Sequence, residues 1–204
     1  MTSISHKTPD AMSVKHFKSL FAAAVLAASL IAAPCMADET STRVAGALAG
    51  AQAIAPTSHI SCKANADGAA ICKTDGYSID ATGCGEGALY GRIMTDGGVD
   101  LNQSVDGKGK VIAHLEKGQF VCSAGHAVNS ETTQHFVVAV ATKSVADCKG
   151  NDLCKNGDHA VAWKVTKPTG TCDPDVDPAK GYASCAAGWI NYDDLDQYSN
   201  GLKD

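Results

Sequence analysis

Residues 110–122 read Lys-Val-Ile-Ala-His-Leu-Glu-Lys-Gly-Gln-Phe-Val-Cys, and this stretch decides the fold class. Two short apolar runs, 110–115 and 119–122, stand on either side of Gly118. Short runs rich in Val, Ile and Phe are typical of strands, and a glycine between them permits a tight turn. The stretch therefore predicts two strands, the second of which ends in a cysteine.

The same signature recurs along the chain. Residues 61–63 and 71–73 flank the turn-rich segment 65–68, which predicts a hairpin. Further short runs of Val, Ile, Phe, Tyr and Trp are found at 89–94, 135–141, 160–166 and 188–191. Only the tail, 192–198, has a helical pattern. We therefore predict an all-β domain, as a small barrel or sandwich.

Cysteine usage indicates both the compartment and the stabilising chemistry. Eight cysteines follow residue 37, and they are Cys62, Cys72, Cys84, Cys122, Cys148, Cys154, Cys172 and Cys185. An even number in an exported domain predicts four disulfides. The short spacings favour Cys148–Cys154 and Cys172–Cys185 as loop staples, with Cys62–Cys72 across the hairpin and Cys84–Cys122 completing the set. Spacing alone leaves this connectivity open.

The N-terminal residues have the pattern of a secretory signal. Lys15 and Lys18 precede the apolar run 20–33, and a small residue, Ala37, follows. We predict a signal peptide over 1–37, cleavage near Ala37, and a periplasmic or secreted protein without a membrane span. Cys35 follows a proline and is expected to be discarded with the signal rather than lipidated. The Ala/Gly-rich residues 38–59 favour a leader or tether, with one weak helix as the alternative.

The charge of the exported chain restricts its partners. Residues 1–37 hold three lysines and one aspartate, so the remaining chain has 14 basic and 21 acidic residues and a formal charge of −7. Nucleic acid and anionic lipid are therefore not expected as main partners, since both need clustered cations. A basic protein, such as a cell-wall hydrolase, would be attracted.

Three segments resemble the bacterial SH3-like (SH3b) domain family. Residues 99–118 (VDLNQSVDGKGKVIAHLEKG) are similar to its opening loop and strand, 163–165 (WKV) to its central strand, and 188–195 (GWINYDDL) to its closing strand. Ser104 stands where the family's loop arginine would be, and extra material lies at 124–134, 145–159 and 171–187. The resemblance implies an SH3-like β-barrel over 88–204, preceded by a disulfide-linked hairpin extension over 60–87.

The resemblance also implies a function and a site. Members of the family bind cell-wall peptides in an aromatic groove, which implies an exported noncatalytic protein that recognises peptidoglycan or a short peptide. The candidate groove residues in this sequence are Trp163, Trp189, Tyr192 and Tyr182. The alternative is that both tryptophans are core residues. The alternative function is a periplasmic inhibitor or immunity protein of a cell-wall-degrading enzyme.

No metal, cofactor or catalytic site is predicted. Asp173, Asp175 and Asp177 alternate like the start of a calcium loop, but Pro178 and Ser184 occupy positions that need glycine and an acidic residue. Zinc is disfavoured because the thiols are expected to be paired, although the sequence holds histidines, namely His114, His126, His135 and His159. A thiol hydrolase would need a free cysteine, and none is left over.

Overall fold

The computed structural model describes residues 36–56, 58–85, 87–173, 181–199 and 201–202, with side chains from residue 39 onward. All of these belong to the larger of two compact units, Cys35–Asp204. The smaller unit, Met1–Pro34, and with it most of the predicted signal peptide over 1–37, lies outside the described residues. Within the described ranges, no helix is both long enough and apolar enough to cross a bilayer.

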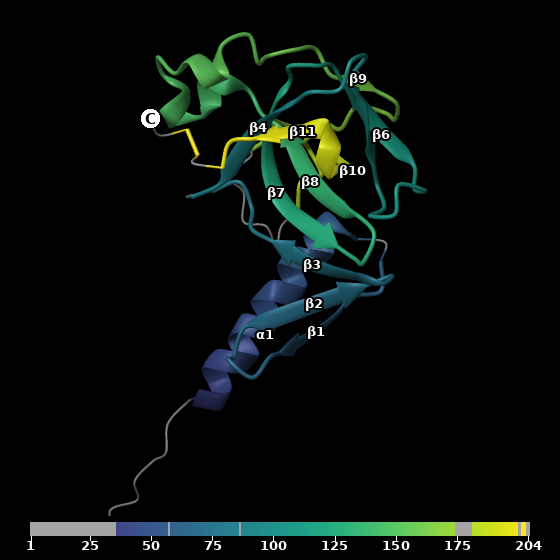
Figure 1. Ribbon diagram of the computed structural model, residues 1–204, viewed down its shortest axis with the longest axis vertical. Helices are drawn as coiled ribbons and strands as arrows, with labels where there is room; N and C mark the ends of the chain where they lie inside the picture. The colour runs from purple at the N-terminus through teal and green to yellow at the C-terminus, as the bar shows by residue number, and fades with distance from the viewer. Residues whose placement is uncertain (1–35, 57, 86, 174–180, 200, 203–204) are drawn as a thin grey trace, which may run out of the picture. The chain divides into compact units, whose positions relative to one another are not determined.

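The unit consists mainly of antiparallel strands, which confirms the all-β prediction at the level of fold class. The strands are β1 (Ser61–Ala64), β2 (Ala70–Thr74), β3 (Tyr77–Ala81), β4 (Leu89–Ile93), β5 (Val99–Asn102), β6 (Val111–Leu115), β7 (Phe120–Val128), β8 (Thr133–Ala139), β9 (Ala162–Trp163), β10 (Ala187–Asn191) and β11 (Leu195–Gln197). One helix, α1 (Met36–Ile54), precedes them (Figure 1). The short 3₁₀ turns include η1 (Thr142–Ser144), η2 (Ala146–Cys148), η3 (Asp152–Cys154) and η5 (Tyr192–Asp194).

The strands form one open antiparallel sheet in the order β1-β2-β3-β7-β8-β10-β5-β6-β9, with β4 pairing both β7 and β11. Closure into a barrel is not observed among the described residues. The long strand β7 changes its edge partner along its length. Its residues 120–123 pair with β4 and its residues 125–128 pair with β3, and a bulge lies between Ser123 and Gly125. The predicted hairpin extension is therefore continuous with the main sheet.

Several predicted boundaries differ from the structure. The segment 124–134, expected as an insertion, is the β7–β8 hairpin, because the bulge in β7 lets the strand continue past Cys122. The run 160–166 forms only the two-residue strand β9. The tail 192–198 is helical only in the 3₁₀ turn η5, and its remainder is β11, which pairs with β4.

Two hydrophobic clusters lie on opposite faces of the central strands. Alternation along β8 places Phe136 and Val138 in one cluster and Val137 in the other. In β10, Trp189 lies in the first cluster and Ile190 in the second. Successive side chains of a strand point to opposite faces, so strands buried on both faces become continuously apolar. This explains the uninterrupted apolar run in β8.

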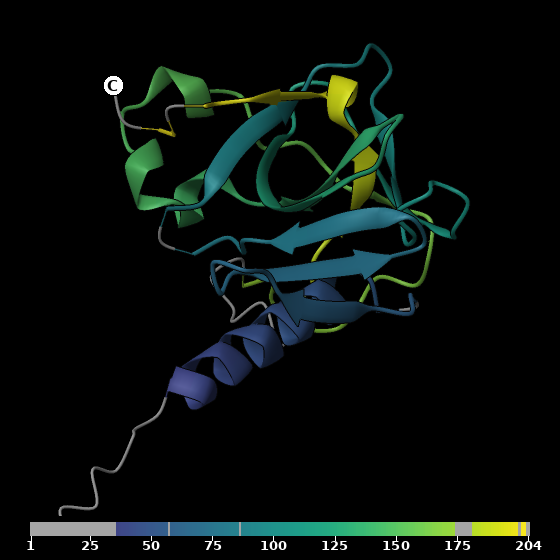
Figure 2. The ribbon, with the colours of Figure 1, turned by 60° about the horizontal axis from the view of Figure 1, so that its bottom comes forward.

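The structure places a helix where a tether was the preferred prediction. Residues Ala47, Gly50, Ala51 and Ile54 follow helical spacing and pack on the sheet. A Cβ added at Gly50 would lie 3.2 Å from the Ala81 Cβ, and one at Gly125 would lie 2.7 Å from the Ile54 Cδ1. Small residues thus let α1 approach β3 and β7 closely, and Figure 2 shows the helix lying across the strands β1–β3. Packing, rather than a strong amphipathic pattern, stabilises this helix.

The carboxyl end of α1 is held by the core. The Trp189 indole Nε1–H donates a hydrogen bond of 2.9 Å to the Ile54 carbonyl oxygen. This carbonyl is one of the last in the helix and has no partner within it, so a donor from β10 satisfies it. Trp189 is 1% exposed.

All four predicted disulfides are confirmed, as Cys62–Cys72, Cys84–Cys122, Cys148–Cys154 and Cys172–Cys185. Cys62 and Cys72 lie directly opposite each other in the β1–β2 register. Cys84 and Cys122 are fully buried and connect the β3–β4 segment to β7. Two bonds therefore cross-link strands or a strand and its neighbouring segment, and the other two lie in the long connections before and after β9.

We predict that the four disulfides differ in their effect on stability. Replacing Cys84 and Cys122 together by alanine should lower the free energy of unfolding by about 4 kcal/mol, against about 2.5 kcal/mol for the Cys148–Cys154 pair, because the bond that closes the longer loop restricts the unfolded chain more. The sequence separations are 38 and 6 residues. Urea unfolding of both double variants checks this. An equal loss would contradict the loop-length argument, and an unchanged midpoint for the fully reduced protein would contradict any structural role.

We also predict that Trp189→Phe destabilises the protein by roughly 2 kcal/mol, because it leaves the buried Ile54 carbonyl without its donor. Thermal unfolding by circular dichroism measures the loss. Val138→Ala, which truncates another buried side chain of the same hydrophobic cluster, serves as the control for lost packing alone. Amide hydrogen exchange should become faster near residue 54 in Trp189→Phe and remain slow there in the control.

Candidate ligand-binding pocket

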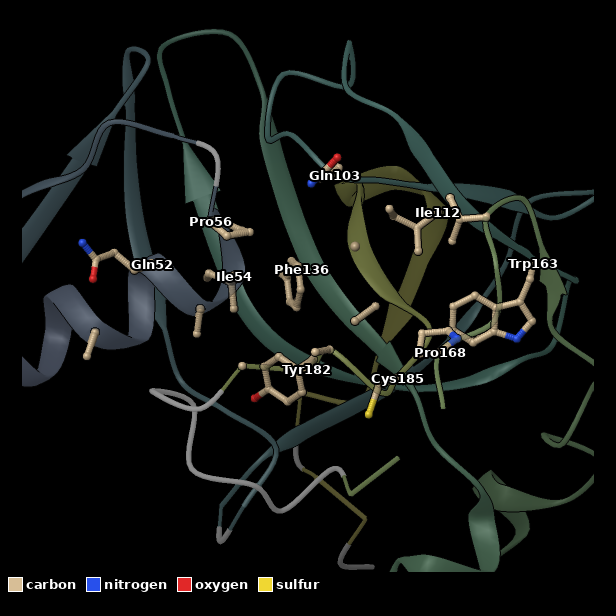
Figure 3. Close-up of a pocket in the computed structure, with 17 residues that line it drawn as sticks. Gln52, Ile54, Pro56, Gln103, Ile112, Phe136, Trp163, Pro168, Tyr182 and Cys185 are labelled. Carbon is tan, nitrogen blue, oxygen red and sulfur yellow. The ribbon is translucent and has the colours of Figure 1, made fainter. Parts of the chain in front are cut away.

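A concave site lies between the carboxyl half of α1 and the sheet, and we call it the α1 pocket. It has a volume of about 540 Å³, within the range of small-ligand sites. Figure 3 shows its walls, which come from α1, the ends of β5 and β6, β8, β9 and the segment leading into β10. Its lining residues are Ala49, Gln52, Ala53, Ile54, Pro56, Gln103, Ile112, Phe136, Trp163, Val165, Pro168, Gly181, Tyr182, Ala183, Cys185, Ala187 and Gly188.

One wall is a face of the helix. Ala49, Gln52, Ala53 and Pro56 recur at helical spacing and all line the pocket. A neighbouring face of the same helix, which includes Gly50 and Ala51, is buried against the sheet. The small residues that recur on these two faces of the helix were the sequence signal for the pocket. This signal was missed because Ala and Gly differ little in hydrophobicity from their neighbours in this segment.

Aromatic rings form the opposite walls. The rings of Phe136 and Tyr182 lie 5.8 Å apart, and Phe136 also makes an edge contact with Trp189 at 5.4 Å. Trp163 lies across the pocket from Tyr182, with Pro168 beside it (Figure 3). Such surfaces suit apolar side chains and flat groups.

The described lining of the pocket carries no charged side chain. None of the described residues that line it is Asp, Glu, Lys, Arg or His. Its polar side chains are Gln52, Gln103 and Tyr182. Burial raises the pKa of Tyr182, and the backbone of Cys84 offsets this shift only in part. The described lining therefore offers neutral amides and apolar surface, whereas the Tyr182 hydroxyl oxygen is itself buried.

The structure separates the four predicted groove residues. Trp163 and Tyr182 both line the α1 pocket. Trp189 is buried, and its indole N–H is occupied by Ile54, as the alternative of a core tryptophan stated. Tyr192 is 55% exposed and lies against His135, outside the pocket lining. The structure therefore brings Trp163 and Tyr182 together at one pocket and places Trp189 and Tyr192 outside its lining.

The histidines occupy different environments. His114 contacts Asp100 through Nδ1 at 2.8 Å and the Gly97 carbonyl through Nε2 at 2.9 Å. His159 lies 3.5 Å from Glu116. In the described part of the chain no three acidic, cysteine or histidine side chains converge as a metal cluster. Of the acidic loop, Asp175 and Asp177 fall outside the described residues.

His135 is the most perturbed titratable group. Its Nδ1 lies 3.0 Å from the Ser123 Oγ, its Nε2 is buried without a hydrogen-bond partner, and the residue is 5% exposed. Burial, with a smaller contribution from His126, lowers the pKa of His135 to about 4. The imidazole is therefore neutral at physiological pH.

Comparison of the chain with models of protein families, with curated proteins and with solved structures found no match. The resemblance to SH3-like domains therefore stays a prediction, and function has to be inferred from the site itself.

We predict that His135 makes the protein less stable as pH falls from about 6.5 to about 4. In this window the unfolded imidazole takes up a proton that the folded one does not, and the pKa difference corresponds to roughly 3 kcal/mol. Urea unfolding of the wild type and of His135→Gln, both in EDTA, measures the pH dependence. The variant should show the shallower loss of stability over this window, and equal slopes would contradict the prediction.

Proposed function

We propose that this is an exported, noncatalytic binding protein that holds a short peptide with apolar side chains in the α1 pocket. The single observation that carries the proposal is the pocket itself, an uncharged cavity of about 540 Å³ between aromatic walls. Four disulfides in the described unit fit an extracellular or periplasmic protein. The signal-like N-terminus supports the same location.

The polar groups of the pocket suit a peptide backbone. The side-chain amides of Gln52 and Gln103 each provide a donor and an acceptor, and both residues line the pocket. A peptide N–H needs an acceptor and a peptide C=O needs a donor, and a glutamine amide provides both. Apolar walls with a few orienting polar groups are the usual composition of a ligand site. The described lining provides no cation for a carboxylate, so it suits an uncharged segment better than a carboxylate-rich cell-wall peptide.

A noncatalytic role is supported by the position of Ser123 and His135, a hydroxyl and an imidazole of the kind that can act as nucleophile and base. Ser123 and His135 are hydrogen-bonded, but both are buried and neither lines the pocket. A nucleophile has to reach its substrate. The described lining residues of the pocket contribute no such pair of nucleophile and base.

A second candidate function, inhibition of a cell-wall-degrading enzyme, is favoured by the loop between β8 and β9. The Cys148–Cys154 disulfide closes its centre. Arg92 Nε and the Tyr198 hydroxyl each donate to the Leu153 carbonyl at 3.1 Å, while Leu153 itself is 38% exposed. A loop held in this way loses little entropy when it docks into a partner.

We predict that Trp163→Ala weakens binding of an apolar peptide at least tenfold, because it removes one aromatic wall of the pocket. Isothermal titration calorimetry with a panel of uncharged pentapeptides, each carrying Leu, Val, Phe or Trp at its centre, identifies the peptide to be used. Tyr192→Ala is the matched control, an exposed aromatic outside the pocket, and should bind as the wild type does.

Two results would reject the proposal. The first is that no peptide of the panel binds at millimolar concentration, and the second is that Trp163→Ala and Tyr192→Ala bind equally. Co-sedimentation with peptidoglycan sacculi separates the remaining alternatives. Saturable, salt-resistant binding would make the wall the ligand, whereas inhibition of a lytic enzyme that depends on Leu153 would favour the inhibitor.

A further inference from the structure

A row of polar side chains crosses the sheet on the face opposite to α1. Asp80 in β3 is directly opposite His126 in β7, and His126 is directly opposite His135 in β8. Directly opposed residues of antiparallel strands point to the same face, with side chains near enough to interact. On the α1 side, the neighbouring pair Ala81 and Gly125 packs against the helix. The bulge in β7 shifts the β7–β8 register by one residue after Ser123 and so aligns His126 with His135.

One ring nitrogen of His135 has an environment that the fold alone does not explain. Its Nε2 is buried without a partner, although buried polar groups are almost always hydrogen-bonded. Its Nδ1 contacts the Ser123 Oγ at 3.0 Å. When Nδ1–H donates to Ser123, the Nε2 carries a free lone pair. A metal-bound histidine has this same arrangement, in which one nitrogen is oriented by a neighbour and the other faces the ion.

We propose that His126 and His135 form a binding site for a divalent transition-metal ion such as Zn²⁺, Ni²⁺ or Cu²⁺. Imidazole nitrogen is a preferred ligand of these ions. Ser123 acts as a positioning residue for the His135 ring, and water completes the coordination. Asp80, exposed at the next position of the row, adds a favourable negative charge. The thiols take no part, since they are paired in disulfides.

Access to this site depends on Tyr192. Its ring lies 5.4 Å from the His135 ring and is itself 55% exposed. An exposed side chain changes rotamer at little cost, so Tyr192 can turn away when an ion binds. The site lies on the opposite face of β8 from Phe136, and its occupation is therefore independent of the α1 pocket.

The test is a titration of the oxidised full-length chain, labelled with ¹⁵N, with ZnCl₂ while the histidine ring signals are followed by NMR. The ring nitrogens of His126 and His135 should shift together and saturably. Calorimetry should show affinity at least tenfold lower in His126→Gln and in Ser123→Ala, where the positioning contact is lost. His59→Gln, a change at an exposed histidine outside the row, is the matched control and should keep the wild-type affinity.

The proposal is overturned if Zn²⁺ leaves both ring signals in place up to millimolar concentration. It is also overturned if Zn²⁺ shifts only other histidines, or if His126→Gln binds as tightly as His59→Gln. Amide spectra of each variant establish that it is folded. Should His135→Gln fail to fold, the wild-type ring signals and the half-buried His126 still decide the outcome.

Discussion

The hydrogen bond from the Trp189 indole to the Ile54 carbonyl is the contact on which the arrangement of this domain depends. It joins the end of α1 to β10, which are far apart in sequence. Trp189 also packs edge-on against Phe136 of β8. One side chain thus fixes where the helix ends relative to two central strands, and the α1 pocket is the space left beside this junction.

The helix can occupy this position only because its contact residues are small. Gly50 faces Ala81, and Gly125 leaves room for Ile54. Helices with little hydrophobic contrast gain most of their stability from tertiary packing. The disulfides act in the same direction, because a domain with few large apolar side chains benefits from restriction of its unfolded chain.

Strand alternation gives the two faces of β8 different surroundings. Phe136 points into the α1 pocket, while its neighbour His135 lies on the other face against Ser123 and Tyr192. The proposed peptide site and the proposed metal site therefore share a strand without sharing a surface. The bulge in β7 contributes to both, since it places Gly125 under the helix and His126 opposite His135.

The sequence by itself determined the all-β class and most of the strands, because strand patterns are local features. It favoured the four disulfide pairs that the structure contains but left their connectivity open, since Cys84 and Cys122 are 38 residues apart. It did not determine α1, whose Ala and Gly residues pack as a helix against β1, β2 and β3. It also could not separate Trp163 and Tyr182, which line the pocket, from Trp189 and Tyr192, which do not. Only the tertiary structure decided this, because the direction of a ring into a cavity, a core or solvent depends on which distant segments pack beside it.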